Sequence, residues 1–139
     1  MNTTEPRAFT TNHEIKILLI DDDPGMLRVL NSVLSIGGYN VESASNGKAA
    51  VHLIETQSFD AIISDVDLPD KDGFEICKLV RRHPRCKLTP ILLMSGRLPE
   101  EQRPKAIEAG ANDFLGKPFP AKQLLEKLSL ALSTNPNAV

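Results

Sequence analysis

Carboxylates gather in two short stretches of this sequence, Asp21-Asp22-Asp23 and Asp65-Val66-Asp67. Each stretch directly follows a short apolar run, IKILLI in the first case and AIIS in the second. Carboxylates that converge on one crevice repel each other unless a cation is present, and hard oxygen ligands of this kind suit Mg²⁺. If the two stretches lie side by side, they predict a site for a divalent metal ion.

A hydroxyl and a primary amine end two further apolar runs: Ser95 closes PILLMS, and Lys117 follows DFLG. A cation and a hydrogen-bond donor are what the free oxygens of a phosphoryl group require. Together with the carboxylates, these two residues indicate phosphoryl transfer to a carboxylate.

Each of these features also has an ordinary structural explanation. Asp23 has the position of a helix N-cap, and the Asp65-to-Asp67 pair could belong to a turn before Pro69. Ser95 could end a strand in a simple turn, and a single lysine is most often a surface residue. The chemical interpretation is favoured because all four positions fall at the carboxyl ends of expected strands, where ligands bind in open α/β sheets.

Five apolar runs are the strand candidates of this chain, and three of them lack the polar alternation of a half-exposed strand. They are IKILLI (15–20), YNVESA (39–44), AIIS (61–64), PILLMS (90–95) and DFLG (113–116). Apolar residues recur with helical spacing in the five segments between and after them, around residues 27–34, 50–54, 76–80, 106–109 and 124–132. This alternation predicts an α/β fold, a doubly wound five-stranded parallel sheet with five helices.

Prolines and glycines mark the expected helix ends. Pro24 and Pro120 fall where a first helical turn tolerates proline, and Gly37 and Gly110 fall where a left-handed residue ends a helix. Asp72-Gly73 has the pattern of a turn and N-cap that begin the third helix. An interior Pro104 would remove a hydrogen bond, so we expect the fourth helix to begin near Arg103 or to be kinked.

Composition restricts the class of protein. The 139 residues carry a net charge of −2 and include 2 cysteines without metal-ligand spacing. We therefore expect reduced thiols and no direct binding of nucleic acid. The sequence contains neither a signal-peptide pattern nor an apolar stretch long enough to span a bilayer, which predicts a cytoplasmic protein without membrane insertion. We expect one domain over residues 14–133, with flexible tails over 1–13 and 134–139.

The order and spacing of four motifs resemble the receiver domain of two-component response regulators. The motifs are ILLIDDDPGMLRVL, IISDVDLPDKDGFEI, ILLMSG and AGANDFLGKPF, and the resemblance runs from about Ile15 to Leu132. The resemblance implies a flavodoxin-like sheet with strand order 2-1-3-4-5. It also implies a phosphorylation switch of the single-domain, chemotaxis-regulator type, because no effector segment follows the receiver motifs.

The resemblance assigns a role to each acidic position. Asp65 would be the phosphoacceptor, and Asp22 would bind Mg²⁺ directly, with Mn²⁺ as an acceptable substitute. Asp21 would act through a metal-bound water, and Asp65 and the backbone carbonyl of Asp67 would complete the protein ligands.

The resemblance assigns the switch in the same way. Ser95 would move toward the phosphoryl group, Lys117 would pair with its oxygens, and Phe114 would be the aromatic residue that changes rotamer. The Lys117-Pro118 peptide is expected to be cis. Three departures from the family pattern concern this region: the extra carboxylate of Asp67, the small Gly116 before the lysine, and Pro104.

The implied partners are a histidine kinase or histidine phosphotransfer protein, which donates the phosphoryl group, and a downstream protein. The downstream protein would bind the face made by the fourth helix, fifth strand and fifth helix, and phosphorylation could also drive dimerisation there. The chain would assist its own phosphorylation and dephosphorylation without being an enzyme for a separate substrate. We also expect a salt bridge between Asp67 and Arg97 that limits the access of water to the phosphoryl group.

Three other functions fit parts of the pattern. A phosphatase of the haloacid-dehalogenase kind also uses two aspartates two residues apart, but there they follow the first strand rather than the third. A pseudo-receiver that serves only for docking would lack an acidic residue or the lysine, and this chain keeps both. A flavodoxin-like cofactor binder needs a phosphate-binding loop after the first strand, where Asp21 to Asp23 would repel a phosphate.

Overall fold

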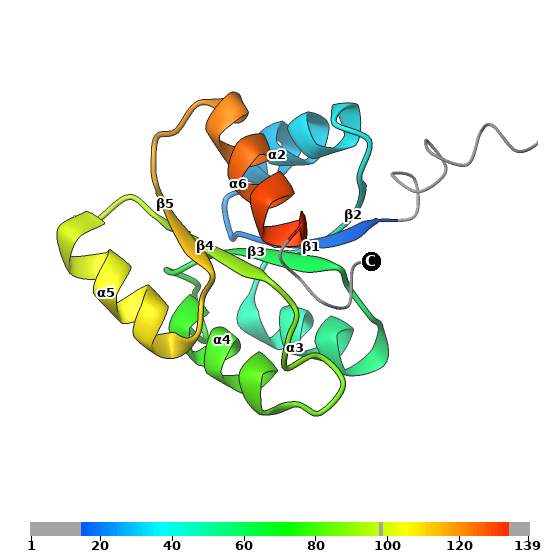
Figure 1. The fold of residues 1–139 in the computed structure, drawn as a ribbon, viewed down its shortest axis with the longest axis vertical. Helices are drawn as coiled ribbons and strands as arrows, with labels where there is room; N and C mark the ends of the chain where they lie inside the picture. The colour runs from blue at the N-terminus through cyan, green and yellow to red at the C-terminus, as the bar shows by residue number, and fades with distance from the viewer. Residues whose placement is uncertain (1–14, 98, 134–139) are drawn as a thin grey trace, which may run out of the picture.

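The computed structural model describes residues 15–97 and 99–133 as a three-layer α/β fold (Figure 1). The tails predicted over 1–13 and 134–139 lie outside the described residues. The elements in chain order are β1 (Lys16–Ile20), α2 (Pro24–Ile36), β2 (Asn40–Ala44), α3 (Gly47–Thr56), β3 (Ala61–Asp65), α4 (Gly73–Arg82), β4 (Ile91–Ser95), α5 (Pro99–Ala109), β5 (Asp113–Gly116) and α6 (Ala121–Ser133). All strand pairs are parallel and the order is β2-β1-β3-β4-β5, which confirms the predicted sheet.

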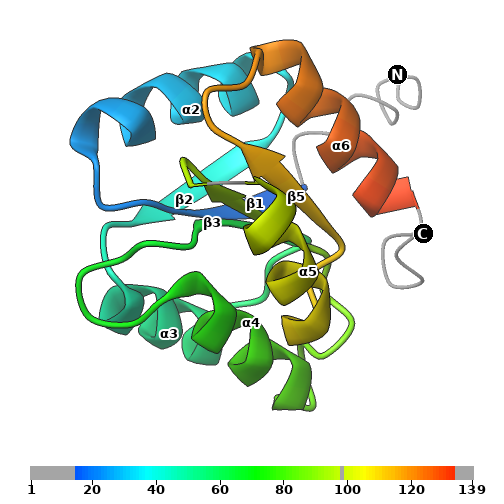
Figure 2. The same cartoon turned by 90° about the vertical axis from the view of Figure 1, so that its left-hand side faces the viewer.

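Helices cover both faces of the sheet, with α2 and α6 on one face and α3, α4 and α5 on the other (Figure 2). The central strands β3 and β4 are buried along their whole length, because their side chains alternate between the two layers. Leu18, Ile62 and Leu93 pack toward α3, α4 and α5. The unbroken apolar runs of the sequence therefore reflect burial on both faces.

The ends of α2 follow the predicted signals, with one correction. Asp23 is the N-cap, its carboxylate accepts a hydrogen bond from the Gly25 N–H, and Pro24 is the first helical residue. The prediction that Gly37 is left-handed is wrong, because Gly37 keeps a helical φ of −72° and donates to the carbonyl of Val33. The chain reverses one residue later, at Gly38 with φ +97°, whereas Gly110 has the expected positive φ of +108°.

The fourth predicted helix, α5, begins at Pro99. Of the two expected alternatives, a start near Arg103 is therefore wrong, and the kink at Pro104 stays a prediction. Pro104 lies inside the helix with its ring exposed, and the hydrogen bond it removes would have ended on the exposed Glu100, whose carbonyl can bind water instead. Gln102, Ala106 and Ala109 are buried on the inner face of the helix. Packing of this face against the sheet compensates for the missing bond.

Two further expectations concern the described residues. Cys77 is buried, Cys86 is half-buried, and both are free thiols. No helix within residues 15–97 and 99–133 is long and apolar enough to cross a membrane.

Candidate functional site

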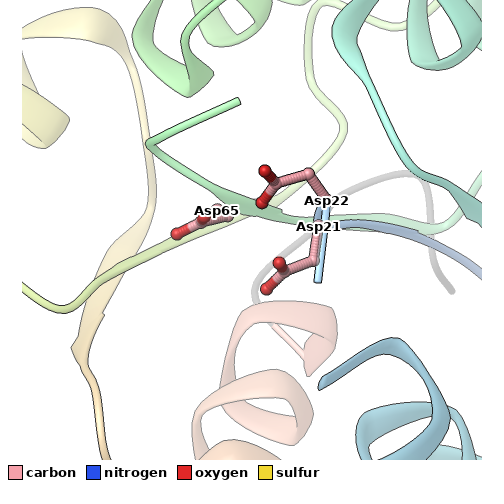
Figure 3. A group of neighbouring side chains, drawn as sticks. All are labelled: Asp21, Asp22 and Asp65. Atoms are coloured by element: carbon pink, nitrogen blue, oxygen red, sulfur yellow. The ribbon is translucent and has the colours of Figure 1, made fainter. Parts of the chain in front are cut away.

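Three carboxylates meet at the carboxyl edge of the sheet, where β1 and β3 end side by side. Asp21 and Asp22 follow β1, and Asp65 is the last residue of β3. One oxygen atom from each of the three side chains lies within 4.8 Å of the others. Figure 3 shows the three side chains grouped at this edge of the sheet. Asp21 and Asp65 are buried while Asp22 is exposed, so the cluster opens to solvent on the Asp22 side.

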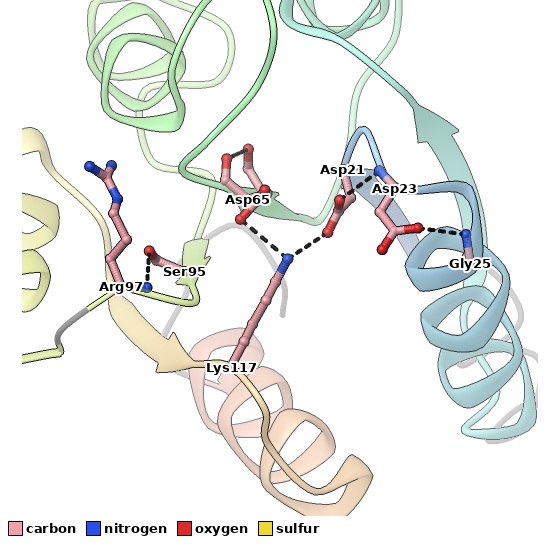
Figure 4. A network of polar contacts seen from close by, with 8 residues as sticks. Asp21, Asp23, Gly25, Asp65, Ser95, Arg97 and Lys117 are labelled. Atoms are coloured by element: carbon pink, nitrogen blue, oxygen red, sulfur yellow. Dashed lines mark hydrogen bonds and ion pairs between the residues drawn. The ribbon is translucent and has the colours of Figure 1, made fainter.

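Lys117 brings a positive charge into this cluster. Its Nζ lies 2.9 Å from Oδ2 of Asp21 and 3.3 Å from Oδ1 of Asp65 (Figure 4). The residue follows β5, its backbone N–H donates to the carbonyl of Ser95 at 2.8 Å, and the next peptide bond, Lys117-Pro118, is cis as expected. The lysine therefore bridges the ends of β1 and β3 from the other half of the sheet.

Burial and charge shift the pKa values of this group. Burial, together with the negative charges of Asp21 and Asp67, raises the pKa of Asp65 to about 6, although Lys117 opposes the shift. Burial alone would lower the pKa of Lys117, but its hydrogen bond to Asp21 and the charges of Asp65 and Asp21 outweigh burial and raise it. At neutral pH Asp65 is thus mostly ionised, and Lys117 carries its proton.

The predicted switch residues Ser95 and Phe114 lie on β4 and β5. Ser95 is fully buried, and its Oγ accepts a hydrogen bond from the Arg97 N–H at 3.0 Å (Figure 4). Phe114 is also fully buried, and the Arg103 guanidinium lies 5.6 Å from the centre of its ring. Ser95 and Phe114 come from neighbouring strands of the sheet.

The expected salt bridge between Asp67 and Arg97 is present. Nη2 of Arg97 lies 2.7 Å from Oδ1 of Asp67, and the two side chains are 57% and 53% exposed. The pair joins the loop after β3 to the loop after β4. Its exposure means that it contributes little to stability, on the order of 0–1 kcal/mol.

The start of α4 packs directly on the backbone at the end of β3. A Cβ atom on Gly73 would lie 2.6 Å from the carbonyl oxygen of Asp65, so only glycine allows this approach. Asp72 is the N-cap, and it forms a capping box with Glu75. The sequence predicted the turn and the cap at this position but not the close contact with Asp65.

Asp70 is the residue near the site that sequence reasoning missed. Its two carboxylate oxygens accept hydrogen bonds from the backbone N–H groups of Gly47 and Lys48, at 2.7 and 2.9 Å. These partners stand 23 and 22 residues earlier in the chain, so no local pattern reveals the contact.

The residues at this edge fit a divalent metal ion. Lys117 supplies one positive charge against three carboxylates, and among the residues that the structure describes it pairs with Asp21 and Asp65. Within the described residues Asp22 has no ion-pair partner, and its exposed carboxylate faces the open side of the cluster. Hard oxygen donors with an open side suit Mg²⁺, which keeps several of its waters.

The comparisons with known proteins agree with this geometry. Residues 17–129 match the response regulator receiver domain family, and the chain belongs to that family. It is 37% identical over 116 residues to the transcriptional regulatory protein GltR of Pseudomonas aeruginosa, covering 84% of this chain and 48% of that protein. It is 36% identical over 118 residues to the response regulator MprA of Mycolicibacterium vanbaalenii, covering 85% and 50%. The chain thus spans about half the length of these curated relatives.

Solved structures show the same fold. The chemotaxis response regulator CheY4 of Vibrio cholerae superposes with a TM-score of 0.79 at 35% identity, covering 84% of this chain and 97% of that one. The receiver domain of the sensor histidine kinase PA1611 of Pseudomonas aeruginosa, with a magnesium ion coordinated in its active-site cleft, has a TM-score of 0.79 at 31% identity. That match covers 86% of this chain and 98% of the other.

The chain is therefore a receiver domain of two-component signalling, a phosphoacceptor module with a flavodoxin-like fold. Receiver domains of this family bind Mg²⁺ and work with histidine kinases and downstream effectors. Because the chain belongs to the receiver family, the two alternatives, a phosphatase and a module that serves only for docking, are not favoured.

Proposed function

We propose that Asp65 is the phosphoacceptor and that it takes the phosphoryl group from a phosphohistidine on a histidine kinase or phosphotransfer protein. One observation carries this assignment. Asp21 and Asp65 both contact Lys117, but of these two only Asp65 lies on a strand that neighbours β4, the strand that ends at Ser95. Lys117 and Ser95 are the cation and the hydroxyl that a phosphoryl group on Asp65 requires.

The transfer itself needs little from the protein beyond position and charge. An ionised Oδ of Asp65 forms a bond to phosphorus while the bond from phosphorus to the donor imidazole nitrogen breaks, and the electron pair of that bond stays on the imidazole. Lys117 holds its proton and turns from Asp21 and Asp65 toward the phosphoryl oxygens. The hydroxyl of Ser95 donates a hydrogen bond to one of these oxygens and keeps its proton.

Asp22, Asp21, Asp65 and the backbone carbonyl of Asp67 would hold Mg²⁺, with Asp21 acting through a bound water and Mn²⁺ as a substitute. The bound ion supplies positive charge to the phosphoryl oxygens during transfer. The clustered carboxylate oxygens and the open side at Asp22 support this ligand set. We infer that the chain is a phosphoacceptor, assisting its own phosphorylation and dephosphorylation, rather than an enzyme for a separate substrate.

The face made by α5, β5 and α6 is the proposed binding surface for a downstream protein. Ser95 and Phe114 adjoin this face, and an added phosphoryl charge near them would shift its conformational equilibrium. We propose protein partners here, including a second copy of the chain after phosphorylation, and no direct contact with nucleic acid because the net charge is −2. The free Cys77 and Cys86 support a cytoplasmic location.

Chemical trapping of the modified residue tests the acceptor assignment. The protein is incubated with acetyl phosphate and Mg²⁺, and borohydride then reduces the acyl phosphate to an alcohol that remains in the peptide. We expect peptide mass spectrometry to find homoserine at position 65. Homoserine at position 21, 22 or 67 would move the acceptor to that residue.

A further inference from the structure

The loop between β3 and α4, residues 66–72, is attached to helix α3, which contributes no residue to the carboxylate cluster. Asp70 reaches from this loop to the start of α3 and accepts hydrogen bonds from Gly47 and Lys48. The helices α3 and α4 lie side by side on the same face of the sheet in both views (Figures 1 and 2). The contact therefore joins the site loop to a neighbouring element of the layer.

The chain has little freedom at this contact. A Cβ atom on Gly47 would lie 2.6 Å from Cβ of Lys71 and 3.1 Å from Oδ1 of Asp70, so the loop rests directly on the backbone of α3. The Asp70 carboxylate also meets the positive end of the helix dipole, which favours its charged form. The hydrogen bonds from Gly47 and Lys48 lower the pKa of Asp70 accordingly.

Few other contacts fix the middle of the loop. Val66 is anchored by backbone hydrogen bonds to Met94 and Gly73, and Asp72 by the capping box of α4. Between these two anchors the polar contacts within the described residues are those of Asp70 and the exposed salt bridge of Asp67. Leu68 adds partial packing against the core.

We propose that Asp70 is a positioning residue for the metal site, acting through the backbone of Asp67. This inference rests on the proposed function, in which the Asp67 carbonyl is a metal ligand. Mg²⁺ tolerates little departure from octahedral geometry, so a ligand carbonyl on a loosened loop binds it less well. Asp70 holds the loop three residues away from this carbonyl, and α3 thereby becomes part of the support of the site.

The test compares two side chains, Asp70 and Asn46, that both accept hydrogen bonds from backbone N–H groups at the start of α3. Asp70→Ala releases the loop from α3, whereas Asn46→Ala removes the N-cap hydrogen bond to Ala49 at the same helix end without touching the loop. Mg²⁺ binding to the unphosphorylated protein is measured by isothermal titration calorimetry. Amide hydrogen exchange of residues 66–72 is measured without metal, in EDTA.

We expect Asp70→Ala to weaken Mg²⁺ binding roughly tenfold and to speed exchange in the loop. Asn46→Ala should lower the melting temperature but leave both readouts at the wild-type level. Asp70→Asn keeps one acceptor oxygen, so it should weaken Mg²⁺ binding less than Asp70→Ala does. If Asp70→Ala does not fold, Asp70→Asn alone provides the test.

Three results would overturn the inference, and the third differs from the first two in what it excludes. If the wild type binds Mg²⁺ and both Asp70 variants bind it equally well, Asp70 does not position the site although the proposed function stands. The same conclusion follows if Asn46→Ala weakens binding as much as Asp70→Ala. If the wild type binds no Mg²⁺, the metal assignment itself fails, and the role of Asp70 fails with it.

Discussion

The Asp65 side chain is only 9% exposed and shares its surroundings with other carboxylates, which makes its charge unfavourable in the metal-free protein. Its pKa rises from 3.8 to about 6 on folding, so the folded state keeps a proton that the unfolded state releases in this range. The contribution of Asp65 to the free energy of unfolding of the metal-free protein is therefore most favourable below about pH 4. It becomes less favourable as the pH rises to about 6. The shift corresponds to at most about 3 kcal/mol.

Asp65→Asn removes this titration, so the variant should gain stability over the wild type as the pH increases from 4 to 7. Urea unfolding of both proteins in EDTA across this range measures the difference, and the pH dependence of other groups cancels. Added Mg²⁺ should restore part of the wild-type stability at neutral pH and leave Asp65→Asn less affected. A stability difference independent of pH would contradict the account.

The salt bridge between Asp67 and Arg97 should affect the rate of dephosphorylation. The two charged side chains come from the loops after β3 and β4, and we expect their pairing to close part of the path of an attacking water. Because the pair is exposed, Arg97→Ala should speed decay of the phosphorylated protein by no more than roughly fivefold. A dephosphorylation time course measures this, with Arg28→Ala on α2 as the control. Decay as slow as in the wild type would show that the pair does not limit water access.

Asp67→Asn breaks the same pair from the other side and removes a negative charge from the rim. Labelling by the anionic donor acetyl phosphate should therefore become faster at low ionic strength, and the gain should shrink as salt screens the field. Initial labelling rates at two salt concentrations measure it. If Asp67→Asn speeds labelling by the same factor at both salt concentrations, the cause is steric and not electrostatic.

At the scale of elements, one carboxylate joins the three parts of the proposed binding surface. Asp113 on β5 pairs with Arg103 of α5 at 3.2 Å and with Lys127 of α6 at 2.9 Å. Burial alone would raise its pKa, but the hydrogen bonds from Lys127, the Phe114 N–H and Arg103 outweigh burial and lower the pKa. These links make α5, β5 and α6 one unit that can respond together.

The readout prediction concerns this unit. Ser95→Ala and Lys117→Ala should uncouple the site from the surface over residues 104–132, because each variant would lose a proposed contact to the phosphoryl oxygens. Amide hydrogen exchange with and without the phosphoryl mimic BeF₃⁻ measures the coupling, with Lys122→Ala, an exposed lysine on α6, as the control. Equal changes in protection in the wild type and Lys117→Ala would remove Lys117 from the switch.

Element boundaries follow from local sequence where one local signal decides them. The strand β5 begins and ends as expected from DFLG, and Asp23 and Asp72 cap the predicted helices. The start of α5 was missed because burial of Gln102, Ala106 and Ala109 outweighs the local effect of Pro104. Gly37 was assigned a left-handed conformation because sequence alone does not distinguish it from Gly38.

For the whole molecule, the strand order brings distant residues to one edge. Parallel strands place every carboxyl end on the same side, so the meeting of Asp21, Asp65, Ser95 and Lys117 follows from recognising the strands. The contact between Asp70 and α3 does not follow, because it depends on how the loop after β3 packs against the start of that helix. The pairing of Lys117 with Asp21 in the metal-free protein depends equally on three-dimensional distance.

The most direct test of the central claim is the intact mass of the protein after incubation with acetyl phosphate and Mg²⁺. The wild type should gain about 80 Da, the mass of one phosphoryl group. It should not gain this mass when EDTA replaces Mg²⁺ in the incubation. Asp65→Asn should remain unmodified while keeping its fold, because an amide is nearly isosteric with the carboxylate but is a poor nucleophile. Equal labelling of Asp65→Asn and the wild type would contradict the assignment of Asp65 as the acceptor.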